Sequence, residues 1–168
     1  MKASAFLDIR NALLAVAAVM AVTLAGAWII ELSGYPPCTL CLYQRKPYYL
    51  LAFAIPAYLA ATRNPGPRLD LFVAGATICI LLVSAGLGIF HAGVEGGFWQ
   101  GPAGCSGSLD ASSVENLLET LRNTRPVSCT KASFWVFGMS LSVWNFIISL
   151  GLSGLVAAAV AREYRLRR

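Results

Sequence analysis

The chain has 168 residues, of which 57% are hydrophobic and only 12% are charged. A soluble globular domain has about one quarter of its residues charged, so this composition excludes an ordinary water-soluble domain and indicates a protein that lives in lipid. The net charge is +5, and the distribution of the basic residues is more informative than their number. We therefore expect an all-α integral membrane protein.

Four apolar runs predict a four-transmembrane-helix bundle in a single domain covering residues 1–168. A helix needs about 20 apolar residues to cross a bilayer. The expected spans are residues 12–32, 42–61, 71–91 and 134–161, and two outward loops, residues 33–41 and 92–133, join them on one side. The second run is short and crosses only if the helix extends back through residues 38–46.

The basic residues predict the orientation. The termini and the short connection near residues 62–70 hold most of the Lys and Arg residues, while the longer loops on the other side hold fewer. By the positive-inside rule both termini are cytoplasmic and the two longer loops face outward. The first run could also be a cleaved signal peptide, but its length favours retention as a span.

The stretch from Pro36 to Arg45 carries two cysteines, Cys38 and Cys41. Proline is tolerated in a first helical turn, so Pro36 and Pro37 predict a helix start beside the cysteines. Unpaired N–H groups and the helix dipole stabilise a thiolate there. The spacing places both thiols and Arg45 on one face, where the guanidinium should lower the pKa of Cys41 and could hold an anionic cofactor. We interpret the stretch as a redox-active dithiol at a membrane surface.

The second outward loop begins after His91, the sole histidine, and contains Cys105 and Cys129. Two interpretations of His91 remain open: a polar residue closing a helix, or a proton donor or acceptor near a redox cofactor. Glu95 lies one turn later and could pair with His91 if the helix continues. Residues 112–122 have helical periodicity with a narrow apolar face, which predicts a short amphipathic helix on the membrane surface.

Of the five cysteines, Cys79 lies within the third run, where we expect a packing role. The other four face outward, and an even set on an oxidising side implies disulfides. Cys38 with Cys41 and Cys105 with Cys129 are plausible pairs, but other pairings remain open.

No metal site is expected. A zinc site could use the four outward cysteines, but Cys105 and Cys129 are not clustered in the sequence. A c-type haem site needs a histidine directly after the second cysteine of the motif, and Leu42 stands there.

The order and spacing of these features resemble the disulfide bond formation protein B (DsbB) family, over nearly the whole chain. The resemblance is carried by residues 37–45, 90–95 and 127–129, by Cys105, and by residues 137–140 with Asn145. After Cys129 the family often has Asp and then Trp, whereas this chain has Thr130 and Phe134.

The resemblance implies a thiol:quinone oxidoreductase of the bacterial inner membrane, with its redox loops in the periplasm. It would reoxidise a periplasmic thioredoxin-like dithiol oxidase (DsbA-like) and so form protein disulfides. The implied cofactor is a membrane quinone, either ubiquinone or menaquinone. The implied partners are the DsbA-like protein and the lipid and quinone pool, with no nucleic acid.

The resemblance also implies residue roles. Cys41 resembles the thiolate that faces the quinone ring, and Cys38 resembles its partner. Cys105 resembles the cysteine that the periplasmic partner attacks, and Cys129 the one that relays to Cys38. The implied quinone-binding residues are Arg45, Cys41, His91 and Gln44.

Two alternatives stay open. The first is a non-enzymatic four-span scaffold whose outer loops are stapled by disulfides and which binds a periplasmic partner. Against it, a bridge between Cys38 and Cys41 would constrain little chain and suits exchange better than stapling. The second is an enzyme similar to vitamin K epoxide reductase, which the early position of the Cys-x-x-Cys motif disfavours.

Overall fold

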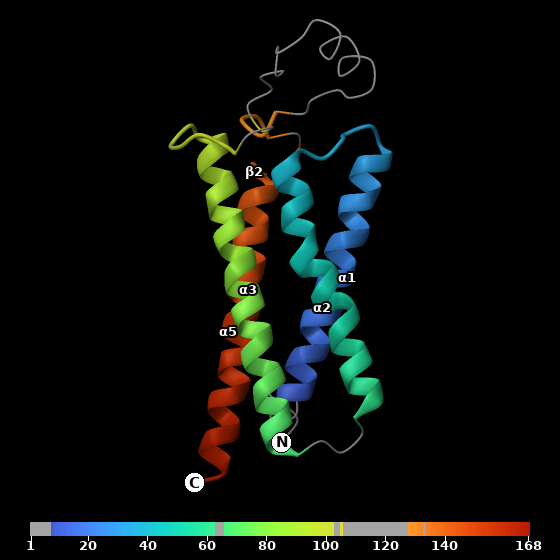
Figure 1. Cartoon of the computed structure of the whole chain (residues 1–168), viewed down its shortest axis with the longest axis vertical. Helices are drawn as coiled ribbons and strands as arrows, with labels where there is room; N and C mark the ends of the chain where they lie inside the picture. Colours follow the sequence, from blue (N-terminus) through green and yellow to red (C-terminus); the bar gives the residue numbers. More distant parts are fainter. Residues whose placement is uncertain (1–7, 63–65, 103–104, 106–127, 133) are drawn as a thin grey trace, which may run out of the picture.

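The computed structural model describes residues 8–62, 66–102, 105, 128–132 and 134–168. Within these residues, four long helices run side by side, and a small hairpin precedes the last one (Figure 1). The elements are α1 (Ile9–Leu32), α2 (Thr39–Ala61), α3 (Pro67–Glu95), β1 (Trp135–Val136), β2 (Met139–Ser140) and α5 (Leu141–Leu166).

Successive helices alternate in direction (Figure 1). The start of α1 and the end of α5 therefore lie at one end of the bundle, and the start of α2 and the end of α3 lie at the other. We call this second end the cysteine end, because Cys38 and Cys41 lie at the start of α2.

Among the described helices, α1, α3 and α5 are long and apolar enough to cross a membrane. Helix α2 has 23 residues, and at about 1.5 Å per residue it is also long enough to cross. It is less apolar because it carries Gln44, Arg45 and Lys46 near its start and two prolines further on. The second apolar run and its expected extension toward the cysteines therefore form one continuous helix. That this helix crosses the membrane remains a prediction.

The bundle is built from two close helix pairs, α1 with α2 and α3 with α5. At Gly88, an added Cβ would lie 2.8 Å from the backbone nitrogen of Phe146 and 3.0 Å from the carbonyl oxygen of Ser142. The missing side chain lets α3 and α5 approach closely, as small residues do between membrane helices. Buried apolar side chains, among them Leu13 and Leu51, fill the space between the pairs.

A buried polar cluster ties α2, α3 and α5 together at Asn145. The Asn145 Oδ1 atom accepts hydrogen bonds from Tyr48 at 2.6 Å, from Ser84 at 3.1 Å and from Ser149 at 3.1 Å. The Nδ2 group of Asn145 donates to the backbone oxygen of Ser84 at 3.3 Å. Because buried polar groups need partners, this cluster fixes how the three helices pack.

The fourth apolar run is not helical from its beginning. We expected a span from residue 134, but α5 begins at Leu141 and the preceding residues form the β1–β2 hairpin. Its two-residue turn has positive φ at Phe137 (49°) and at Gly138 (77°), and a helix cannot continue through that backbone conformation. Trp144 closes the hairpin onto α5 by donating to the oxygen of Val136 at 3.0 Å.

Three further expectations have different outcomes. Helix α3 continues past His91 to Glu95, as the pairing of these two residues requires. Cys79 is exposed and lies outside the buried core, in a groove that it lines with Pro47 and Leu50 of α2, so the packing role expected from burial is not found. The amphipathic helix expected at residues 112–122 lies outside the described residues.

Candidate active site

Cys38 and Cys41 lie at the start of α2. Cys38 is the N-cap residue, and its sulfur accepts a hydrogen bond from the backbone N–H of Cys41 at 3.2 Å. Side-chain caps of this kind satisfy one of the unpaired N–H groups of a first turn. The two sulfur atoms are 2.6 Å apart, and both thiols are free. A disulfide has a sulfur–sulfur distance of about 2.05 Å, so the two sulfur atoms are close enough for a two-electron oxidant to join them with little movement.

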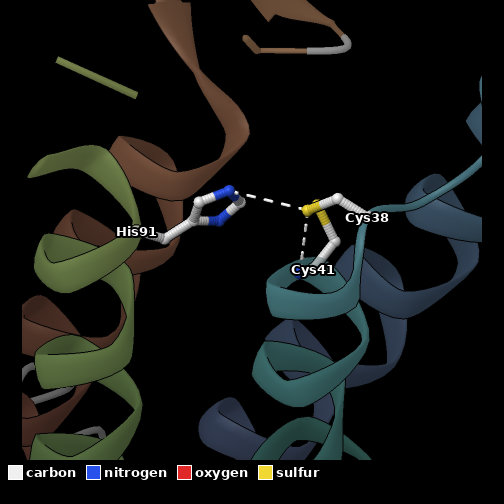
Figure 2. Close-up of side chains that lie close together, drawn as sticks. All are labelled: Cys38, Cys41 and His91. Atoms are coloured by element: carbon white, nitrogen blue, oxygen red, sulfur yellow. Dashed lines mark hydrogen bonds between the residues drawn. The ribbon is translucent and has the colours of Figure 1, made fainter. Parts of the chain in front are cut away.

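His91 reaches the pair from the last turns of α3 (Figure 2). Its Nε2 atom lies 3.6 Å from the sulfur of Cys38 and 3.6 Å from Oε1 of Glu95. The other ring nitrogen, Nδ1, is 3.3 Å from Nε2 of Gln44, which also donates to the backbone oxygen of Leu87 at 3.1 Å. His91 is only 3% exposed, so its ring belongs to the site and not to the surface.

The hydrogen bond to Leu87 identifies the tautomer of His91. A carbonyl oxygen can only accept, so the Gln44 atom that contacts it is the amide nitrogen. The same NH₂ group then donates its second hydrogen to Nδ1 of His91, which must be unprotonated to accept it. A neutral His91 therefore carries its proton on Nε2, the atom that faces Cys38.

The two thiols differ in pKa. The hydrogen bond from the Cys41 side chain lowers the pKa of Cys38 to about 4; burial opposes this, and contacts with His91 support it. The pKa of Cys41 is raised, first by the hydrogen bond that it makes to Cys38 and then by burial. Cys38 is therefore the thiolate of the reduced pair and Cys41 is the thiol. We expected Arg45 to lower the pKa of Cys41, and this is wrong in the reduced pair.

The guanidinium of Arg45 is turned toward α1. Its Nη1 atom is 2.5 Å from Oε2 of Glu31, and its Nη2 atom donates to the oxygen of Ala27 at 3.4 Å. The guanidinium carbon lies 5.8 Å from the ring centre of Trp28, within the range of a cation–π contact. The guanidinium is thus paired with a carboxylate of α1, and the raised pKa of Cys41 results from its hydrogen bond to Cys38 and from burial.

The second cysteine pair forms a disulfide, Cys105–Cys129. Both residues are fully buried, and they pack in one cluster with Cys38, Cys41, Leu40 and Val94. At Gly101, a Cβ would lie 2.8 Å from the Cβ of Cys105, so a larger residue there would displace the bridge. The fold therefore brings Cys38, Cys41, Cys105 and Cys129 together at the cysteine end.

A cavity of about 140 Å³ opens between α1, α2 and α5 beside the pair. Its wall includes Cys41, Gln44 and Arg45 from α2, Tyr48 one turn deeper, and Trp144 and Asn145 from α5. A cavity of roughly 150 Å³ accommodates one benzene-sized ring. The walls are mainly apolar, with a few polar groups, as is typical of sites for flat organic ligands.

Comparisons with known proteins bear on this arrangement. The family model described as "Disulfide bond formation protein DsbB" matches residues 9–159. The chain belongs to the DsbB family. This makes it a multi-pass inner-membrane protein of disulfide bond formation, and membership implies an oxidoreductase activity.

Two individual proteins are similar to this chain. A disulfide bond formation protein B from Polaromonas sp. is 27% identical over 142 residues, which cover 78% of this chain and 79% of that protein. An uncharacterized protein from Rickettsia prowazekii is 26% identical over 136 residues, covering 78% of this chain and 76% of that protein. No solved structure shows a significant match.

The structure places the DsbB-like residues as follows. The four cysteines, His91 and Gln44 meet at the cysteine end, and Arg45 lies at the adjoining cavity while bound to Glu31. Sequence reasoning did not single out Glu31 or give Asn145 a role. Both residues could have been noticed in the sequence, because an acidic or strongly polar side chain within an apolar run usually has a role in helix packing or in function.

Proposed function

We propose that this DsbB-family protein is a thiol:quinone oxidoreductase that reoxidises a DsbA-like dithiol protein of the periplasm. Electrons pass from the donor to Cys105–Cys129, then to Cys38–Cys41, and finally to a membrane quinone. The observation that carries the proposal is the single buried cluster that holds both cysteine pairs. Exchange between two pairs requires a thiolate of one pair to reach a sulfur of the other, and packing in one cluster supplies that proximity.

The thiol steps balance without an outside reagent. A donor thiolate attacks Cys105 and releases Cys129, and the second donor thiol then closes the donor disulfide and releases Cys105. Cys129 attacks Cys38 of the oxidised pair and releases Cys41, after which Cys105 attacks Cys129 and releases Cys38. At the end of these steps Cys105 and Cys129 are joined by a disulfide, and Cys38 and Cys41 are free thiols. The structure has the same combination.

The residues at the cavity fit a quinone. Cys41 lines the cavity, and the mainly apolar lining with room for about one ring suits a flat head group. A quinone held there would supply the terminal two-electron acceptor that closing the Cys38–Cys41 disulfide requires. Arg45 offers guanidinium N–H groups at the same wall to orient such a ligand, while the NH₂ group of Gln44 is occupied by Leu87 and His91.

Different residues act on the two thiols of the reduced pair. His91 directs its Nε2 proton at Cys38 and holds the thiolate in place. Cys41 retains its proton next to the cavity, and closing the disulfide requires it to give up that proton while the pair passes two electrons to an acceptor in the cavity. Glu95, which accepts a hydrogen bond from Ser142 at 2.7 Å, places a carboxylate oxygen 3.6 Å from Nε2 of His91.

The orientation follows from the same proposal. The cysteine end faces the periplasm, where disulfides persist, and both termini face the cytoplasm. The excess of basic residues at the opposite end supports this orientation by the positive-inside rule. Crossing by α2, as a fourth span, is part of the proposal.

The test is quinone reduction by purified protein in detergent, with a reduced thioredoxin-fold dithiol protein as donor. Ubiquinone and menaquinone analogues are assayed separately. Turnover should vanish in Cys41→Ser and in Cys105→Ser, because each variant removes one sulfur from the relay. Cys79→Ser is the matched control and should keep full turnover, since this free thiol lies on the outside of α3. Failure of every quinone, together with donor-resistant disulfides, would instead support the stapled scaffold.

A further inference from the structure

Cys38, Cys41 and His91 form a cluster of three metal-binding side chains. Their two sulfur atoms and one ring nitrogen all lie within 4.8 Å of one another (Figure 2). The cluster joins the start of α2 to the end of α3, and two of its members are buried. Thiolate and imidazole are the ligands that zinc prefers in proteins. This site is not predictable from residue spacing, because His91 is far from the two cysteines along the chain.

We propose that the reduced Cys38–Cys41 pair and His91 bind one Zn²⁺ ion, and that the bound ion holds the pair in an inactive, reduced form. Three protein ligands leave a fourth position for water, as in open zinc sites. Two thiolates balance the charge of the ion, and the Glu95 carboxylate beside His91 adds attraction for a cation.

The distances support tetrahedral coordination. With zinc–sulfur and zinc–nitrogen bonds of about 2.3 and 2.05 Å, the sulfur and nitrogen of one tetrahedron lie about 3.6 Å apart. The sulfur of Cys38 and Nε2 of His91 are 3.6 Å apart, so this edge is already formed. The two sulfur atoms must separate from 2.6 Å to about 3.8 Å, which a rotation of the half-buried Cys41 side chain can provide.

Gln44 sets the affinity of the site. A zinc ion on Nε2 of His91 requires the ring proton on Nδ1, and that proton needs an acceptor. The group now beside Nδ1 is the amide NH₂ of Gln44, so its amide must turn over and give up the hydrogen bond to Leu87. Glutamate at position 44 would supply the acceptor directly, as carboxylates do behind many zinc-bound histidines.

The site exists only in the reduced protein, since a Cys38–Cys41 disulfide has no thiolate to offer. Zinc binding and oxidation of the pair therefore exclude each other. A bound ion would also keep Cys129 and any ligand of the cavity from reacting with either sulfur. Zinc would thus act as a reversible block of the redox site.

The test is calorimetric titration of the protein with Zn²⁺ in detergent, without donor or quinone, so its outcome does not depend on the proposed function. Reduced protein should bind one ion per chain, and protein with an oxidised Cys38–Cys41 pair should bind none. A Cys105→Ser/Cys129→Ser variant should bind like the wild type, which excludes the second pair as the source of ligands. Absorption of bound Co²⁺ should show thiolate ligands in tetrahedral geometry.

The variants make the assignment specific. Cys38→Ser and Cys41→Ser should each weaken zinc binding by about 100-fold or more, and His91→Ala by about 10-fold, in protein shown by circular dichroism to be folded. Gln44→Glu should tighten binding by about 10-fold, a gain that misfolding cannot mimic. Cys79→Ser should leave binding unchanged. Equal binding by oxidised protein, or unchanged affinity in both Cys38→Ser and His91→Ala, would overturn the proposal.

Discussion

The guanidinium of Arg45 binds the carboxylate of Glu31 with 2.5 Å between Nη1 and Oε2, and so joins the start of α2 to the last turn of α1. Both side chains are largely buried, with 14% and 30% of their surfaces exposed. The ion pair holds the positive charge at the edge of the cavity beside Cys41. If that cavity takes a quinone, Glu31 acts through Arg45 as a positioning residue.

This relationship predicts non-additive kinetics. Arg45→Ala should raise the apparent KM for quinone by about 10-fold, the loss expected for one charge-assisted hydrogen bond. Glu31→Gln should raise it less, by about 3-fold, because the guanidinium remains but is less well oriented. The double variant should resemble Arg45→Ala alone. Glu163→Gln, which removes the exposed ion pair with Arg167, is the control, and purely additive effects would contradict the coupling.

The low pKa of Cys38 predicts that this thiol reacts at acidic pH. In reduced protein that lacks Cys79, Cys105 and Cys129, the alkylation rate of Cys38 should fall only as the pH drops toward about 4, where the thiolate gains its proton. Cys41→Ser retains a hydroxyl donor, so the pKa of Cys38 should stay low in that variant. Cys41→Ala removes the donor, so the pKa should rise. Iodoacetamide labelling followed by mass spectrometry measures the rates, and identical profiles in the two variants would refute this assignment.

The buried hydrogen bonds at Asn145 predict a stability loss that depends on the group removed. Asn145→Leu strips the acceptor from Tyr48, Ser84 and Ser149 together, whereas Tyr48→Phe removes only one bond. Hydrogen bonds between membrane helices contribute roughly 0.6 kcal/mol on average, and at most about 1.7 kcal/mol. We expect a loss of about 2 kcal/mol for Asn145→Leu and under ~1 kcal/mol for Tyr48→Phe. Thermal unfolding in detergent measures both, and equal losses would show that Asn145 is not the centre of the cluster.

The contact between α3 and α5 predicts opposite results for two nearby glycines. A Cβ at Gly88 would meet backbone atoms of Phe146 at 2.8 Å and Ser142 at 3.0 Å, whereas a Cβ at Gly86 would meet nothing within 4 Å. Gly88→Ala should therefore destabilise the protein by about 1–3 kcal/mol, because backbone atoms cannot move aside easily. Gly86→Ala should be neutral or slightly stabilising, since alanine favours helix. Unfolding midpoints in detergent compare the pair directly, and a tolerated alanine at residue 88 would argue against the close approach.

The sequence by itself determined the features that depend on neighbouring residues. Hydropathy predicted the long helices, and adjacent prolines predicted where α2 starts, to within two residues of Thr39. The Cys-x-x-Cys spacing predicted two thiols meeting at that helix start, because positions i and i+3 share a face. The order of the motifs also indicated the DsbB family, which the family match confirms.

Only the tertiary structure decided which residues from different helices meet. It placed His91 and Gln44 together against Cys38, selected Cys105–Cys129 among the open pairings, and turned Arg45 toward Glu31. Such contacts depend on how whole helices rotate and pack, which local periodicity does not encode. The β1–β2 hairpin shows the same limit. The hydropathy of the run from residue 134 predicts a membrane-spanning helix, but the positive φ values at Phe137 and Gly138 place a hairpin turn there instead. The chemistry of the site, including which of the two thiols is the thiolate, follows from those long-range contacts and from the hydrogen bonds they create.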